Sequence, residues 1–233
     1  FEAGGRRLID GIDLTLEAGR RSVILGPNGA GKSLFLRLIH GLIQPTSGRI
    51  AWSGRSPGRE VRLSQAMVFQ QPVLLRRSVA ANVDYALRLR ELPRAERQKR
   101  IEDVLTATGL RRFASQPARL LSVGEQQKLA LARAWALRPD VLFLDEPTAS
   151  LDPAATRAVE EIILRIDAGG TKIIMSTHDL AQASRLANEV LFLHRGRLCE
   201  QTPASVFFSA PRTAEAGYFL EGELFPQLRR IQQ

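Results

Sequence analysis

A glycine-rich segment with the spacing of a phosphate-binding loop is the clearest chemical pattern in the chain. Gly26 is followed, after four residues, by Gly31-Lys32-Ser33. In this pattern backbone N–H groups converge on phosphate oxygens, the lysine reaches the β and γ phosphates, and the serine hydroxyl binds Mg²⁺. A glycine-rich turn that binds nothing is the weaker alternative. The residues expected to hold a nucleotide are Gly26, Pro27, Asn28, Gly29, Ala30, Gly31, Lys32, Ser33 and Leu34.

Two adjacent carboxylates, Asp145 and Glu146, follow the apolar run 141–144. Such a run indicates a buried strand, so the carboxylates stand where the chain leaves the interior. We expect Asp145 to be the acid on the metal side and Glu146 to orient and deprotonate an attacking water. A solvated strand end is the alternative. His178 also follows an apolar run, but a lone histidine is more often structural or merely exposed.

Strands and helices must bring these residues to one edge of a sheet. Short apolar runs predict buried strands, and apolar residues at helical spacing predict a helix after Gly31 and two further helices. Because strands alternate with helices, we expect an α/β fold with a mainly parallel sheet, in which ligands bind at the carboxyl ends of the strands. The expected strands cover 22–26, 140–144, 172–176 and 190–194, and the two further helices cover 154–168 and 179–188.

The stretch from Ser78 to Ala136 breaks this alternation, because its apolar residues indicate consecutive helices without strands between them. We interpret it as a helical subdomain inserted into the sheet domain. The predicted organisation is a core of residues 1–73 and 137–201, a helical subdomain of residues 74–136 and a helical tail of residues 202–233.

Charge and composition narrow the classes of function. The 233 residues include 33 Lys and Arg against 24 Asp and Glu, a formal net charge of +9 that favours an anionic partner: nucleic acid, a nucleotide or a membrane surface. The arginines fall in scattered pairs and form no basic arm.

One cysteine and three distant histidines exclude a disulfide framework and structural zinc. No apolar run approaches the roughly 18 residues of a membrane span, so we expect a soluble chain without a secretory signal.

Further segments accompany the phosphate loop and the carboxylate pair in a fixed order. With them the chain resembles the nucleotide-binding subunit of ATP-binding cassette (ABC) transporters over nearly its whole length. The resemblance implies a P-loop NTPase fold, with a RecA-like, mainly parallel sheet, an inserted α-helical subdomain and an antiparallel β edge. The matching segments are the Q-loop at 67–70, the signature at 121–127, the D-loop at 149–152 and the switch-histidine segment at 176–179.

The resemblance also implies roles for single residues. Glu146 resembles the general base, His178 the contact to the γ phosphate, and Gln70 the ligand that links Mg²⁺ and water to the membrane partner. Catalysis would rest on these three residues and Lys32. Mg²⁺ would be held by Ser33, Gln70 and Asp145.

In this family two subunits pair head to tail, and each ATP lies between the phosphate loop of one chain and the signature of the other. Ser122, Gly124 and Glu125 would therefore act on the partner's nucleotide through a helix N-terminus, and Asp152 would communicate across the dimer. Phe1 is close to where the family stacks an aromatic ring on adenine. The implied partners are a second copy or another ABC subunit, membrane permease subunits and, indirectly, an extracytoplasmic solute-binding protein. The chain would then lie at the cytoplasmic face of the inner membrane.

Three features depart from the family pattern. Val123 replaces the first signature glycine, and we expect activity to be retained because Gly124 is present. Leu34 stands where a second hydroxyl residue often follows Ser33, which removes one phosphate contact and leaves the magnesium ligand. The family's first β-strand should precede Phe1, so we expect the natural chain to start upstream.

Within the family, importers fit best. The chain has one cassette and no room for long coiled coils. Its tail and residues 77–83 resemble ATPases of oxyanion importers, in particular tungstate uptake systems, so the expected solute is an oxyanion such as tungstate or molybdate. A phosphate or amino-acid importer is the alternative. Residues 69–83 would receive a helix of the permease, although about half of their apolar residues are expected to be ordinary core.

Rival hypotheses are a nucleic-acid-associated ABC ATPase, suggested by the charge, and a P-loop kinase, which leaves the signature unexplained. We expect no specific nucleic-acid binding, because no aromatic residues are interleaved with the arginines.

Overall fold

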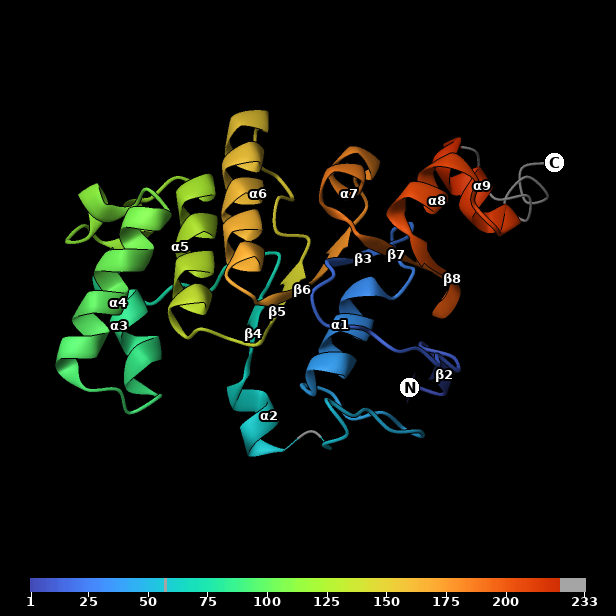
Figure 1. Cartoon of the computed structure of the whole chain (residues 1–233), viewed down its shortest axis with the longest axis horizontal. Coiled ribbons are helices and arrows are strands. Elements are labelled where there is room, and N and C mark those ends of the chain that lie inside the picture. The colour runs from blue at the N-terminus through green and yellow to red at the C-terminus, as the bar shows by residue number, and fades with distance from the viewer. Residues whose placement is uncertain (57, 223–233) are drawn as a thin grey trace. The chain divides into compact units, whose positions relative to one another are not determined.

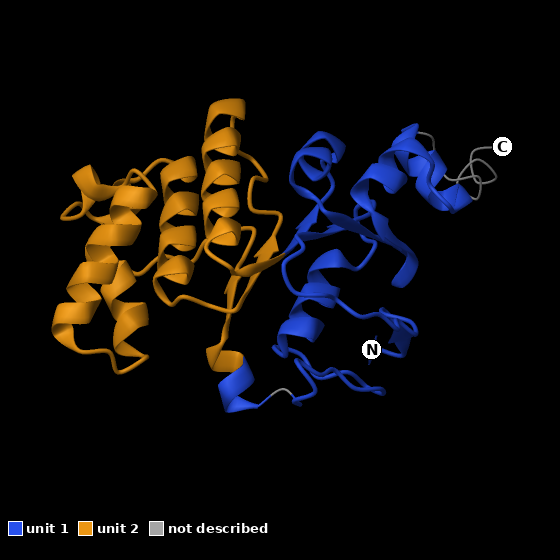
Figure 2. Ribbon diagram, viewed as in Figure 1, with its two compact units in different colours: residues 1–61, 174–233 blue, residues 62–173 orange. Residues whose placement is uncertain are grey.

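The computed structural model describes residues 1–56 and 58–222 and divides into two compact units, residues 1–61 with 174–233 and residues 62–173 (Figure 2). Helix α2 (Arg59–Leu63) and strand β6 (Lys172–Thr177) each span a boundary between the units. The division expected from the sequence, at 73/74 and 136/137, stays a prediction. Each unit combines strands with helices (Figure 1).

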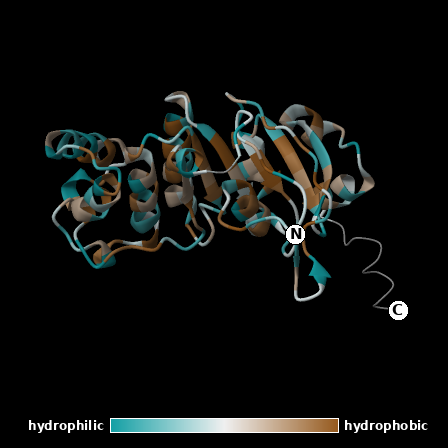
Figure 3. Cartoon of the chain, turned by 90° about the horizontal axis from the view of Figure 1, so that it is seen from below, coloured by the Kyte–Doolittle hydropathy of each residue, from teal (hydrophilic) through white to brown (hydrophobic). Residues whose placement is uncertain are grey.

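In the first unit the strand β3 (Ser22–Leu25) pairs in parallel with two neighbours, the β6 residues 174–177 and β7 (Glu189–His194). All four residues of β3 are buried, and the strands are strongly hydrophobic in colour (Figure 3). A last strand, β8 (Arg197–Pro203), runs antiparallel to β7. The strands predicted around 22–26, 172–176 and 190–194 are therefore confirmed, and β8 supplies the antiparallel edge.

Helices of the first unit follow its strands. Helix α1 (Lys32–His40) follows β3, and α7 (Leu180–Leu186) follows β6 and is shorter than the expected 179–188. The tail contains α8 (Ala204–Ser209) and α9 (Ala214–Leu220). It packs on β7 through aromatic rings, since the ring centroid of Phe192 lies 5.8 Å from that of Phe207 and 5.2 Å from that of Phe219. Residues 223–233 of the expected tail lie outside the described residues.

A short hairpin opens the chain. Its strands, β1 (Glu2–Ala3) and β2 (Arg6–Arg7), pair antiparallel around Gly4 and Gly5, which both have positive φ angles. Positive φ is readily accessible only to glycine, so the glycine pair explains the tight turn. The described residues contain no long strand between this hairpin and β3.

In the second unit β4 (Gln65–Val68) pairs in parallel with β5 (Val141–Asp145), with Val68 opposite Leu144. Every residue of β5 is buried, which explains the continuous apolar run that predicted it. Strand β4 was not predicted as a strand, because its four residues include a polar Gln65 and make too short an apolar run.

The consecutive helices predicted from Ser78 to Ala136 are confirmed, and they lie in the second unit. Its helices α3 (Val79–Arg88), α4 (Arg94–Ala107) and α5 (Val123–Ala136) lie side by side (Figure 1). Two 3₁₀ turns, η1 (Arg111–Phe113) and η2 (Ala118–Leu120), connect α4 to α5. The helix α6 (Pro153–Ala168) packs on α5. The buried core of the helical stretch consists of Val79, Val83, Leu87, Val104, Leu105, Leu110, Ala118, Leu121, Leu129, Ala132 and Ala136.

Within the described residues, no helix has the length and apolar character required to cross a membrane.

Candidate nucleotide-binding site

The phosphate loop, residues 26–33, joins β3 to α1 as the sequence predicts. Its first glycine lies against the end of β7, because a Cβ on Gly26 would be 2.1 Å from the carbonyl oxygen of Leu193. Only a residue without a side chain fits at that distance. Gly26 therefore lets the loop leave β3 in close contact with the neighbouring strand.

The far end of the loop is shaped by a tight turn. The N–H of Ala30 donates to the carbonyl of Pro27 at 3.1 Å. Gly31, with φ of +99°, caps α1 without a side-chain hydrogen bond, and its carbonyl accepts the N–H of Phe35 at 2.8 Å. A helix that begins this way directs its first N–H groups and its positive dipole end at the loop, which suits an anion.

Lys32 is buried, and its side chain bends back over the loop. Its Nζ donates to the carbonyl of Gly26 at 2.9 Å and to that of Pro27 at 3.2 Å. The ammonium group is thereby held at the loop. Ser33 and Leu34, both half-buried, complete the first turn of α1. The predicted phosphate-loop residues are thus brought together.

His178 shares the sheet edge with the phosphate loop. In the parallel pairing of β3 with β6, Leu25 lies opposite Thr177, so Gly26 and His178 leave neighbouring strands at the same level. His178 is exposed, and the next residue, Asp179, caps α7 by accepting the N–H of Gln182 at 3.0 Å. Register alone therefore places an exposed imidazole beside the loop, as expected for a contact to a phosphate.

The carboxylate pair stands at the equivalent edge of the second unit. Asp145 is 2% exposed, and Glu146 is half-buried with a φ of +44°. This left-handed conformation costs a residue with a side chain about 1 to 3 kcal/mol, a strain that concentrates at functional sites. The strain is accompanied by a turn, in which the Glu146 carbonyl accepts the N–H of Ala149 at 3.1 Å.

Gln70 leaves the sheet next to this pair. Val68, the last residue of β4, lies opposite Leu144 of β5, so Gln70 and the carboxylates follow paired residues at the same end of the two strands. Gln70 is exposed. Strand register thus puts Gln70 and the carboxylates at the same strand ends within one unit, and His178 and the phosphate loop at the same strand ends within the other.

The signature segment forms the start of α5 through a capping box. The carboxylate of Glu125 accepts the backbone N–H of Ser122 at 2.9 Å, and the Ser122 hydroxyl accepts the N–H of Glu125 at 3.4 Å. Hydrogen bonding from the Ser122 N–H lowers the pKa of Glu125 below its usual range. The pattern Ser-x-x-Glu is the sequence signature of such a cap, so this structural role of Glu125 was visible in the chain and is additional to the expected nucleotide contact.

Other expected site residues also have structural roles. Gly124 lies against α6, because a Cβ there would be 2.9 Å from the Cβ of Ala155. Asp152 caps α6 and accepts the N–H groups of Ala154 and Ala155 at 2.9 and 2.8 Å. The carboxylate of Asp152 is therefore fixed at a helix N-terminus, where negative charge is favourable.

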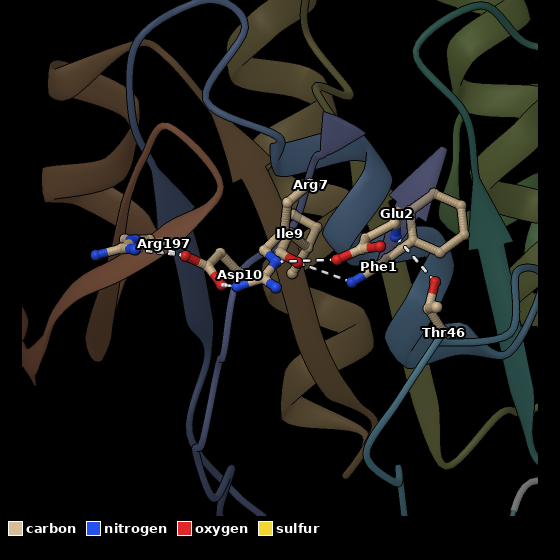
Figure 4. Close-up of polar contacts among 7 residues, drawn as sticks. All are labelled: Phe1, Glu2, Arg7, Ile9, Asp10, Thr46 and Arg197. Carbon is tan, nitrogen blue, oxygen red and sulfur yellow. Dashed lines mark hydrogen bonds and ion pairs between the residues drawn. The ribbon is translucent and has the colours of Figure 1, made fainter. Parts of the chain in front are cut away.

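Phe1 is held by the segment that follows the hairpin. Its carbonyl accepts the N–H groups of Leu8 and Ile9 at 2.9 and 3.2 Å. Its nitrogen donates to the carbonyl of Ile9 at 2.7 Å (Figure 4). As a whole residue, Phe1 is half-buried. Phe1 is thus anchored through its backbone, and its contact with adenine stays a prediction.

Comparisons with known proteins identify the family to which this chain belongs. The family model described as ABC transporter matches residues 9–149. The tungstate uptake system ATP-binding protein of Peptoclostridium acidaminophilum is 40% identical over 84% of this chain and 92% of that protein. A phosphate import ATP-binding protein of Natronomonas pharaonis is 36% identical over 94% of this chain and 83% of that protein. Matches at similar identity are named for methionine import and for Fe(3+) ion import.

A solved structure agrees with the fold. A dimeric ATP-binding cassette in a post-hydrolysis state, bound to ADP and Pi, superposes with a TM-score of 0.78 at 26% identity and covers 88% of this chain and 94% of that chain. The P-loop NTPase fold of this chain follows from that likeness and from its mainly parallel strands.

Proposed function

Because the chain belongs to the ABC transporter family and is an ATPase coupled to transport, we propose that it energises the uptake of an oxyanion such as tungstate or molybdate. The relative with 40% identity is named for tungstate uptake. The resemblance of residues 77–83 and of the tail to oxyanion importers supports the same solute class. The solute is carried by other subunits, so the proposal rests on these likenesses and not on a contact made by this chain.

The observation that carries the ATPase mechanism is the strand register. Leu25 lies opposite Thr177 and Val68 opposite Leu144, and this register supports roles for His178 beside the phosphate loop and for Gln70 beside the carboxylate pair. In the proposed reaction the oxygen of a water attacks the γ phosphorus while Glu146 accepts a proton from that water. The bond between the γ phosphorus and the β–γ bridging oxygen breaks, and ADP and phosphate leave.

The chain's own groups bind and orient the nucleotide. Lys32 and the N–H groups at the start of α1 hold the phosphates, and His178 contacts the γ phosphate. The proposed magnesium ligands are the hydroxyl of Ser33, the amide of Gln70 and the carboxylate of Asp145. These are hard oxygen donors, which fit Mg²⁺. The ion would neutralise charge on the phosphates.

We further propose that two copies, or this chain with another ABC subunit, close around two ATP molecules and reopen after hydrolysis. Each signature, with the N-terminus of α5, would face the nucleotide held by the other chain. The exposed residues that follow the Q-loop would receive a cytoplasmic helix of the permease, so that the subunit sits at the cytoplasmic face of the membrane. Dimer closure would then drive alternating access in the permease.

The solute is tested by reconstitution. The ATPase, its permease and its solute-binding protein are placed in liposomes, and hydrolysis is measured with tungstate, molybdate, phosphate and methionine at equal concentration. We expect tungstate or molybdate to stimulate hydrolysis, and phosphate and methionine to leave the basal rate unchanged. Stimulation by phosphate or methionine alone would replace the oxyanion proposal with the phosphate or amino-acid alternative. Lys32→Ala is the control, since it should abolish hydrolysis with every solute.

A further inference from the structure

The turn between β7 and β8 contacts the phosphate loop directly. Gly196, in that turn, donates its backbone N–H to the carbonyl of Ala30 at 2.9 Å. A Cβ on Gly31 would lie 2.9 Å from Ile9 Cδ1 and 3.7 Å from the Cα of Gly196. The β7–β8 turn and the segment before β3 therefore pack against the loop beside Ala30 and Gly31.

The bond to Ala30 fixes the orientation of a phosphate-loop donor. In a planar trans peptide the carbonyl and the following N–H point in opposite directions. With the Ala30 carbonyl turned toward Gly196, the N–H of Gly31 is turned away from the β7–β8 turn. Phosphate loops bind anions through N–H groups of this kind. The turn thus sets the direction of one such donor.

Asp10 ties the N-terminal segment to the same turn in two ways. Its backbone N–H donates to the carbonyl of Gly196 at 2.9 Å. Its Oδ2 accepts from Nε and Nη2 of Arg197, at 2.8 and 2.5 Å. Figure 4 shows Asp10 between Arg197 and Arg7, whose Nη1 donates to Oδ1 at 2.9 Å. The segment approaches so closely that a Cβ on Gly196 would be 2.2 Å from the carbonyl oxygen of Leu8.

We propose that Asp10 is a positioning residue for nucleotide binding, which clamps Arg197 and the β7–β8 turn so that the Ala30 carbonyl and the Gly31 N–H keep their orientation. Arg7 extends the clamp to the hairpin through its ion pair with Glu2, at 3.1 Å. The hydrogen bond from Arg7 and that from Arg197 lower the pKa of Asp10, so the carboxylate is charged at neutral pH. The proposal rests on ATP binding by the chain and is independent of the transported solute.

The test measures nucleotide affinity, with ADP as the probe because it is not hydrolysed. Calorimetric titration of the full chain with Mg²⁺ and ADP should give a Kd about three- to fivefold higher for Asp10→Asn, the size expected for loss of an exposed, hydrogen-bonded ion pair. The KM for ATP should rise with it, and kcat should change less than about twofold, because the chemical step is untouched. Asp10→Glu keeps the charge and should restore most of the affinity.

A double variant of Asp10 and Arg197 distinguishes a positioning role from a general effect on the stability of the fold. Arg197→Ala should raise the Kd as much as Asp10→Asn, and the double variant should match the single ones, because both remove the same clamp. The control is Arg20→Ala, which breaks the exposed pair of Arg20 with Glu17 at 3.2 Å in the same unit and should leave the Kd unchanged. An unchanged Kd in Asp10→Asn, whether or not its thermal midpoint falls, would overturn the proposal. So would additive effects in the double variant.

Discussion

The structural requirements at positions 123 and 124 of the signature differ. Val123 is the first residue of α5, and it is 59% exposed. Helical backbone angles at that position do not require glycine. Gly124 is required by packing, since a Cβ would come within 2.9 Å of Ala155 Cβ. The replacement of the family's first signature glycine by Val123 is therefore compatible with the local fold.

At the residue scale, Val123→Gly should leave the ATPase rate within about twofold, because the change removes an exposed side chain and keeps the capping box. Steady-state hydrolysis by the purified chain checks this. Gly124→Ala is the contrasting variant: its added methyl group should push α5 from α6 and lower both the thermal midpoint and the rate. A sharp loss of hydrolysis in Val123→Gly would contradict the tolerance that we infer for this position.

The chemistry of single residues was predictable where spacing alone defines it. Glycine and lysine spacing identified the phosphate loop, and the end of an apolar run identified the two carboxylates. The positioning role of Asp10 was not predictable, because its partner Arg197 is 187 residues away in sequence and only the fold brings them together. The strained backbone of Glu146 is likewise a property of the turn after β5 and has no signal in residue type.

At the scale of elements, α3 and α4 are joined by an ion-pair cluster. Asp84 on α3 accepts from Arg88 Nε at 2.6 Å and from Arg97 Nε, on α4, at 2.8 Å. Desolvation raises the pKa of Asp84, but the hydrogen bonds from Arg97 and Arg88 outweigh it, so the pKa lies below its usual 3.8. The cluster thus stabilises the helical stretch only while Asp84 is ionised.

The sign of the pH dependence follows from this lowered pKa. The stabilisation is fully present at a pH above 3.8, the pKa of Asp84 in the unfolded chain. It is lost as the pH falls through the lower pKa that Asp84 has in the folded chain. We expect Asp84→Asn to lower the thermal midpoint by about 1 to 3 °C at pH 7. The difference should shrink in acid below pH 4. A difference between variant and parent that stays constant from pH 7 to pH 3 would exclude ionisation of Asp84 as its cause.

Helices and strands with a long apolar pattern could be predicted from the sequence, and those with a short pattern could not. The buried β5 and the helices of the region 78–136 were found because their patterns are continuous. Strand β4 was missed because it has only four residues and one of them, Gln65, is polar, and it is defined by its pairing with β5. The end of α7 at Leu186, before the predicted residue 188, reflects the extended backbone of Ala187, with a ψ of 135°, which local composition does not reveal.

At the scale of the whole molecule, the residues with proposed catalytic roles are divided between the two compact units. The phosphate loop and His178 belong to one unit, and Gln70, the carboxylates and the signature belong to the other. The family's head-to-tail pairing would add the signature of a second chain to each nucleotide. The proposed mechanism therefore depends on assembly of two chains, which was expected from the resemblance to the family and not from the spacing of residues in this chain.

The most direct test of the ATPase account is the molar mass of Glu146→Gln with and without ATP, measured by light scattering after size exclusion. This variant keeps the nucleotide ligands and loses the base, so ATP should bind and remain intact. We predict a monomer without ATP and, with ATP and Mg²⁺, a dimer of about twice the 25.8 kDa chain mass. Adding Lys32→Ala should abolish the dimer. Rapid ATP turnover by Glu146→Gln, or a monomer at saturating ATP, would contradict the account.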